Sequence, residues 1–160
     1  MDDFTAIIGI RQRKADALRR VETASNTACD AARMRLAETR DAKLAYLEEI
    51  RTLEIDLLTE LVNSEITIGD LGKLEATLLA AEQKAKALAA DHDLALAQLL
   101  EREAEVEAAR LDRRVATSKL NRISEIDRGL RALQTQLDAA RQETELEEFV
   151  ETMPRPGAGP

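Results

Sequence analysis

Large aromatic side chains are nearly absent from this sequence. Its 160 residues include no tryptophan, one tyrosine and two phenylalanines, although 44% of the residues are hydrophobic. A compact globular domain normally fills its centre with several aromatic rings, whereas alanine and leucine supply most of the apolar content here. Charged residues make up 34% of the chain. Together these features are typical of long helices and coiled coils.

Cysteine, histidine and proline are also scarce. Cys29 is the only cysteine, which excludes an intrachain disulfide, and we expect it to be a small, semi-buried residue. His92 is the only histidine and lacks the cysteine or histidine partners of a metal site. The first proline is Pro154, so residues 1–153 are free to be helical.

Long apolar runs and an excess of positive charge are missing as well. No stretch approaches the ~20 apolar residues of a transmembrane helix, and the N-terminal run has neither the basic start nor the length of a secretory signal. The net charge of −8 argues against a general nucleic-acid-binding surface. We therefore expect a cytoplasmic protein.

Two glycines close together mark the one mid-chain cluster of helix breakers. The segment NSEITIGDLG at 63–72 contains Gly69 and Gly72 beside cap-forming and β-branched residues. It predicts a turn at about 63–70, with Thr67 or Asp70 as the N-cap of the next helix. The tail from 153 to 160 is rich in proline and glycine, and we expect it to be disordered.

Apolar residues after this turn recur in alternating steps of three and four from Leu71 to Leu137, as the a and d positions of a heptad do. The polar exceptions are His92, Arg102, Arg113, Asp127 and Gln134. Before the turn the pattern is less regular, and its apolar residues are Ile7, Ile10, Ala17, Val21, Ala24, Ala28 and Ala31, then Tyr46, Ile50, Leu53 and Leu57. The change of phase between these two sets predicts either a stutter or a wider apolar face.

These patterns predict an all-α fold, a long two-helix antiparallel coiled-coil hairpin. We expect a single domain over 1–152, with helix one at about 3–62 and helix two at about 71–150, so that residues 11–20 lie opposite 112–122. About 20 residues of helix two would extend past the start of helix one. The alternative is one continuous helix in a parallel dimer, against which the two glycines weigh.

The sequence predicts no enzyme, no cofactor and no metal. The segment with Gly69 and Gly72 lacks the strand and the Lys-Ser/Thr pair of a phosphate-binding loop. A catalytic cysteine needs a base and an orienting group, and Cys29, beside Ala28 in a stretch of small residues, is better explained as a structural residue. Carboxylates are abundant, but paired carboxylates catalyse reactions only inside a concave pocket, which a two-helix rod lacks.

Basic residues gather on both helices near the open end of the predicted hairpin. We define the basic belt as the eight cations Arg11, Arg13, Lys14, Arg19, Arg20, Arg113, Arg114 and Lys119. Like charges held together repel unless acidic groups offset them. The belt is either a solvated face or a docking surface for an acidic protein; nucleic acid and a membrane surface are weaker alternatives, because stacking aromatics and a bulky apolar face are missing.

Two segments resemble one family. Residues 4–18, FTAIIGIRQRKADAL, and 66–85, ITIGDLGKLEATLLAAEQKA, resemble the start and the hairpin region of the FliJ/YscO/HrpO group of bacterial type III secretion proteins. The resemblance implies a stalk that binds the secretion ATPase and an export gate protein at the inner membrane, and in some systems substrate chaperones.

The same resemblance places the export-gate contact on five residues, Tyr46, Ile50, Leu74, Leu78 and Ala81. An aliphatic residue at Leu74 replaces the family's aromatic one, and the family's histidine near Ala85 is absent. A place in the seam between the helices would explain Leu74, Leu78 and Ala81 equally well. The alternative function is a generic coiled-coil scaffold that homodimerises. A measurement of mass in solution distinguishes the two functions, because a monomer would favour the stalk.

Overall fold

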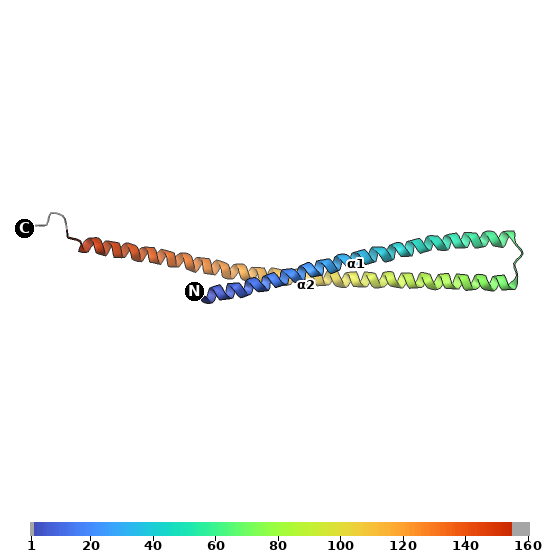
Figure 1. Cartoon of the computed structure of the whole chain (residues 1–160), viewed down its shortest axis with the longest axis horizontal. Coiled ribbons are helices and arrows are strands. Elements are labelled where there is room, and N and C mark those ends of the chain that lie inside the picture. Colours follow the sequence, from blue (N-terminus) through green and yellow to red (C-terminus); the bar gives the residue numbers. More distant parts are fainter. Residues whose placement is uncertain (1, 155–160) are drawn as a thin grey trace, which may run out of the picture. The chain divides into compact units, whose positions relative to one another are not determined.

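A computed structural model describes residues 2–154, which form two helices joined by a short turn (Figure 1). Helix α1 spans Asp2–Asn63 and helix α2 spans Ile68–Thr152. The helices pack against each other, and no strand occurs within the described range. The predicted all-α antiparallel hairpin is therefore confirmed, and the parallel dimer of one continuous helix is wrong.

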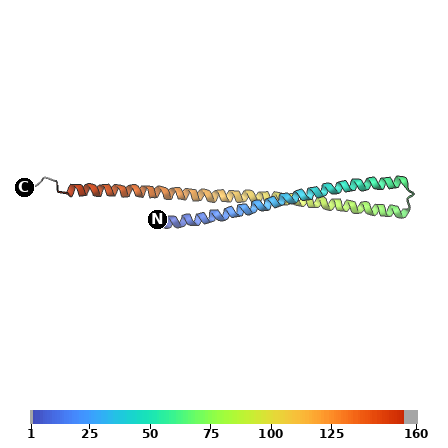
Figure 2. The same ribbon diagram turned by 45° about the horizontal axis from the view of Figure 1, so that its top comes forward.

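The contacts between residues divide the chain into two units. The terminal unit contains 2–18 of α1 and 112–154 of α2, and the turn unit contains 19–111. Both helices continue through the unit boundary without a break. In the turn unit, α1 and α2 lie side by side and meet at the turn in both views (Figure 2).

Thr67 and Asp70 form the start of α2 through reciprocal hydrogen bonds. The Asp70 N–H donates to Thr67 Oγ1 at 3.2 Å, and the Thr67 N–H donates to Asp70 Oδ2 at 3.3 Å. This is a capping box, in which two otherwise unpaired backbone donors are satisfied and a carboxylate lies at the positive end of the helix dipole. Thr67 is therefore the N-cap, and Asp70 is its partner rather than an alternative cap.

The turn is shorter than predicted, because α2 begins at Ile68 instead of about 71. Gly69 and Gly72 lie inside the first turns of α2, so the prediction that they form the turn is wrong. The capping box specifies the helix start at Thr67, and glycine is tolerated in the first turn. The helix ends, predicted at about 62 and 150, fall at Asn63 and Thr152.

The seam of α2 follows the predicted heptad from Leu74 to Asp127. Ala81, Ala95, Leu99, Val106, Ala109, Ala116 and Leu120 are all buried on it. In the turn unit, Leu99 and Val106 form a cluster with Cys29, which is 2% exposed. In the terminal unit, Ala116 and Leu120 cluster with Ala15, which confirms the predicted pairing of 11–20 with 112–122.

The α1 seam before Tyr46 differs from the prediction by one residue. Its buried or half-buried positions are Ile8, Arg11, Ala15, Leu18, Glu22, Ser25, Cys29, Ala32, Leu36, Thr39 and Lys43, followed by Tyr46, Ile50, Leu53 and Leu57. These positions keep steps of three and four throughout, so α1 has no stutter. Of the two predicted alternatives, the wider apolar face agrees with the apolar residues that lie beside the seam.

The residues predicted for this part of the seam lie beside it. Ile7, Ile10 and Val21 are 39%, 61% and 51% exposed, Ala17, Ala24 and Ala31 are exposed, and Ala28 is half-buried. The physical reason is that two neighbouring stripes of α1 are both rich in small apolar residues. The stripe that places Ala15 against Ala116 permits close helix contact, and it leaves Arg11 and Glu22 half-buried.

The end of α2 has a different environment from the rest of the helix. Every residue from 128 to 152 is exposed, whereas Asp127 is 8% exposed. In the terminal unit α2 therefore extends well past α1, as predicted from the helix lengths. Met153 and Pro154 are not helical; the rest of the tail predicted to be disordered, 155–160, lies outside the described residues.

Candidate partner-binding surfaces

The basic belt divides between the two units. The terminal unit contains six of its cations, Arg11, Arg13, Lys14, Arg113, Arg114 and Lys119, and the turn unit contains Arg19 and Arg20. Within the terminal unit, the contact of Ala15 with Ala116 and Leu120 brings the two cationic stretches to the same level. The structure therefore gathers these six predicted residues on one unit.

Exposure separates these six cations into two groups. Arg13, Lys14, Arg114 and Lys119 are exposed, so their charges are available to a partner. Arg13 Nε donates to the Gly9 carbonyl at 3.3 Å, which holds this side chain along α1. In contrast, Arg11 and Arg113 are half-buried. Arg11 lies on the seam, and its buried Nε has no hydrogen-bond partner among the described residues.

Acidic groups reduce the repulsion expected within the belt. Asp16 is half-buried in the same stretch of α1 and accepts a hydrogen bond from Gln12 Nε2 at 3.1 Å. Asp16, Arg113, Arg19 and Glu22 are each engaged in a further interaction. The exposed cations, rather than Arg113, are therefore the ones that an acidic partner can reach.

An open hollow of about 390 Å³ lies on the outer surface of α2 in the terminal unit. Arg113, Arg114, Thr117, Ser118, Asn121, Arg122 and Glu125 line it. The exposed guanidinium groups of Arg114 and Arg122, with several neutral polar side chains, suit the recognition of carboxylates. Arg122 is exposed, lies three residues after Lys119 and belongs to this surface.

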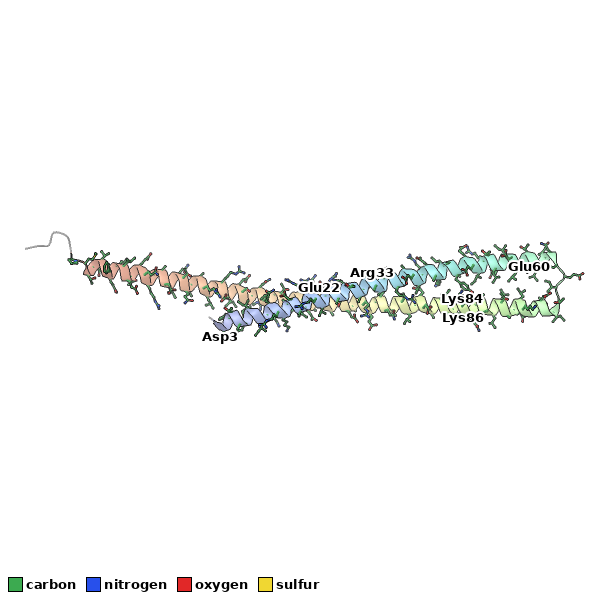
Figure 3. All side chains as sticks on the ribbon, viewed as in Figure 1. Asp3, Glu22, Arg33, Glu60, Lys84 and Lys86 are labelled. Atoms are coloured by element: carbon green, nitrogen blue, oxygen red, sulfur yellow. The ribbon has the colours of Figure 1, made fainter. Side chains whose placement is uncertain are left out.

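The five residues proposed for the export gate lie in the turn unit. Tyr46 Oη donates a hydrogen bond to the Ala81 carbonyl at 3.3 Å, and Lys84 Nζ lies 4.5 Å from the centroid of the Tyr46 ring. Figure 3 shows Lys84 on the side of α2 that faces α1. These contacts fix the register of the two helices here and bring Tyr46 and Ala81 together.

Burial favours the seam interpretation for most of this set. Tyr46, Ile50 and Leu74 are half-buried and Ala81 is 9% exposed, whereas Leu78 is 41% exposed. Residues that contact the other helix have little surface left for a partner. Of the five, Leu78 is the residue most available for binding.

Apolar side chains near the turn form a surface that the heptad pattern missed. Ile55, Leu58 and Val62 of α1 are 63%, 61% and 83% exposed, and Ile68 of α2 is 90% exposed. A hollow of about 380 Å³ between the helices is lined by Leu57, Leu61 and Leu74, with Glu60, Glu65 and Lys73 among its polar groups. The sequence does contain a signal for this surface, because Ile55, Leu58 and Val62 are apolar although they lie outside the predicted seam positions.

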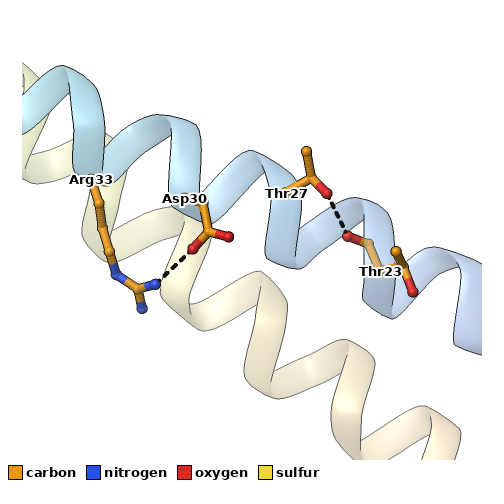
Figure 4. A network of polar contacts seen from close by, with 4 residues as sticks. All are labelled: Thr23, Thr27, Asp30 and Arg33. Atoms are coloured by element: carbon orange, nitrogen blue, oxygen red, sulfur yellow. Dashed lines mark hydrogen bonds and ion pairs between the residues drawn. The ribbon is translucent and has the colours of Figure 1, made fainter.

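The outer face of α1 elsewhere carries short-range polar contacts. Thr27 Oγ1 donates to the Thr23 carbonyl at 3.0 Å, and Arg33 Nη1 pairs with Asp30 Oδ1 at 2.9 Å (Figure 4). Contacts between residues three or four apart support a helix only slightly, and exposed ion pairs contribute little to stability. This face is a solvated helix surface.

Residues 2–154 contain no candidate metal site and no candidate membrane-spanning helix. No group of three or more potential ligands could hold a metal ion there. Neither helix, over the same residues, contains a stretch long and apolar enough to cross a bilayer. His92 is half-buried on the seam, with Nδ1 at 3.9 Å from Asp93 Oδ1, which agrees with its predicted place. The absence of enzyme activity and of cofactors stays a prediction.

Comparisons with protein families, curated proteins and solved structures find no match to this chain.

Proposed function

We propose that this chain is a non-enzymatic stalk or escort component of a bacterial type III secretion system. It would bind the secretion ATPase through the exposed cations of the terminal unit, and promote protein export from the cytoplasmic face of the inner membrane. The observation that carries this proposal is the placement of Arg13, Lys14, Arg114 and Lys119 on one unit, all exposed. The sequence resemblance of 4–18 and 66–85 supplies the class of partner.

The physical argument is electrostatic. Exposed cations on a helix pair attract an acidic protein surface, accelerate its association and define its orientation more than they add affinity. Such a surface needs no catalytic pocket, and the described surface offers open hollows rather than enclosed ones. The acidic lining of a hexameric ATPase channel would suit this surface.

The export gate protein is the second proposed partner, and secretion chaperones are a third. Leu78 is the exposed member of the five residues assigned to the gate. Ile55, Leu58 and Val62 of α1, which line one hollow, and Ile68 of α2 are further exposed apolar side chains of the turn unit. A gate-binding site would therefore centre on these residues rather than on the half-buried Tyr46.

The test is a calorimetric titration of the chain with the secretion ATPase of its own system. Reversal of Arg13 and Lys14 to glutamate should weaken binding by about tenfold or more, because both charges are solvent-accessible. The matched control reverses Arg51 and Lys86, whose side chains are 76% and 75% exposed in the turn unit. It makes the same change in net charge and should bind like the wild type.

Salt provides the second arm of this test. Exposed charge pairs are screened over about 10 Å at 0.1 M ionic strength, so wild-type affinity should fall as salt rises. Equal binding by both double variants, or indifference to salt, would mean that the belt is a solvated face.

A homodimerising scaffold is the second candidate function. The observation that favours it is the exposed end of α2, from 128 to 152, which continues an apolar stripe with no burial against α1.

A further inference from the structure

The exposed face of α2 in the terminal unit has an arrangement that is complementary to itself. Its first half carries two cations followed by apolar residues, Lys119, Arg122, Ile126, Leu130 and Leu133. Its second half carries small or apolar residues followed by two anions, Leu137, Ala140, Thr144, Glu148 and Glu151. Successive members are three or four residues apart, so all of them share one side of the helix.

The two halves mirror each other about a point between Leu133 and Leu137. Lys119 precedes this point by as many residues as Glu151 follows it, and the same holds for Arg122 and Glu148. In an antiparallel pair of such helices, each cation of one copy therefore meets an anion of the other. The apolar residues of both copies meet in the middle.

These side chains are available for contact. Ile126, Leu130, Leu133 and Leu137 are 49%, 45%, 53% and 55% exposed. The four charged residues at the ends of the face are exposed too. A stripe of aliphatic side chains at this spacing normally packs against another helix, and in the described terminal unit α1 does not bury it.

The end of α2 is also electrostatically unfavourable on its own. Glu143, Glu147 and Glu151 are spaced four residues apart, and like charges at this spacing destabilise a helix. The last turn contains no basic residue, although the negative end of a helix dipole favours cations. Cations from another molecule would relieve both effects, and α2 itself carries such cations at 119 and 122.

We propose that a second copy of this chain binds the exposed face of α2. The two copies pair antiparallel around a two-fold axis between Leu133 and Leu137, with Lys119 against Glu151 and Arg122 against Glu148, twice each. The contact is isologous and closes at two copies. The contact involves one helix face of each copy, so we expect a reversible dimer.

This inference does not rest on the proposed stalk function; it deepens the second candidate function, homodimerisation, because both use the exposed end of α2. The inference and the stalk function are nevertheless linked through Lys119, which belongs both to the basic belt and to the proposed dimer contact. Self-association and ATPase binding would then compete for the same cation.

Sedimentation equilibrium of the full chain over a range of concentrations tests the proposal. The wild type should form a reversible monomer–dimer equilibrium. Replacement of Leu133 and Leu137 by asparagine should raise the dimer dissociation constant by about tenfold or more, since two apolar contacts are lost at the axis. The control replaces Leu94 and Leu100, each 59% exposed in the turn unit, and should dimerise like the wild type.

Charge reversal identifies the pairing itself. Arg122→Glu and Glu148→Arg should each weaken the dimer, because each places like charges against one another twice. The double variant exchanges the two charges and should restore dimerisation to within about threefold of the wild type. A wild type that stays monomeric at all concentrations would overturn the proposal, as would a dimer unaffected by the leucine changes or a double variant weaker than both single ones.

Discussion

Leu99 and Leu100 offer a matched pair of positions for a test of the seam. Leu99 is 8% exposed and packs in the cluster with Cys29 and Val106, whereas Leu100 is 59% exposed. Replacing either residue by alanine removes the same atoms from neighbouring positions of one helix. The difference between the two variants therefore measures packing and not helix propensity.

The expected magnitude follows from burial. Truncation of a well-buried leucine to alanine costs about 2–5 kcal/mol, through lost transfer free energy and the cavity that remains. Only one helix packs on this seam, and the neighbours Cys29 and Val106 are small, so we expect the lower end, about 2 kcal/mol, for Leu99→Ala. Leu100→Ala should change the free energy of unfolding by less than about 0.5 kcal/mol, as surface substitutions usually do.

Urea denaturation followed by circular dichroism measures both effects. The midpoint of Leu99→Ala should fall clearly, and that of Leu100→Ala should stay close to the wild-type value, with similar slopes for both. Equal losses in the two variants would refute the assigned seam. A larger loss for Leu100→Ala would show that α2 faces α1 with the side that carries Leu100.

Two further predictions concern the α1 seam and the start of α2. Ile8→Ala should lower the midpoint more than Ile7→Ala in the same denaturation experiment, because Ile8 packs on the Ala15 cluster and Ile7 is 39% exposed; the reverse order would restore the seam predicted from apolarity alone. Thr67→Ala removes the N-cap hydroxyl and should lower the free energy of unfolding by about 1 kcal/mol. Ser64→Ala removes a hydroxyl that donates to the Glu60 carbonyl at 2.7 Å, at the end of α1, and should lower it less. Equal losses in the two variants would contradict the capping assignment.

The sequence predicted those features that a single periodic signal determines. The α2 heptad was assigned correctly because its apolar residues form one stripe, and the antiparallel pairing followed from the turn between two amphipathic segments. The prediction for the α1 seam was wrong, because Ile7 and Ile8 begin two apolar stripes that lie side by side. Choosing between them requires the partner helix, where Ala116 accepts the close approach of Ala15.

The candidate sites were less accessible to sequence reasoning. Tyr46 was singled out as a partner-binding residue, but its hydrogen bond to the Ala81 carbonyl depends on the register of the hairpin, which the sequence alone does not fix. Conversely, the heptad places Leu137 on the seam, and Leu133 lies one residue before the seam position of Gln134. They are exposed because α1 does not run alongside the part of α2 that carries them. This depends on how the two helices pair and cannot be seen in the sequence of either helix alone.

The most direct measurement for the whole account is the distance between spin labels on the two helices of the terminal unit. Ala17 and Val115 are both exposed, and each lies beside a member of the cluster that joins α1 to α2. Helix axes in contact are about 8–10 Å apart, so labels at these positions in one molecule should lie within about 25 Å, even after dilution with unlabelled protein. A continuous helix at 1.5 Å per residue would separate them by about 150 Å. A distance of that order within one molecule, with short distances only between molecules, would contradict the hairpin and every surface assigned on it.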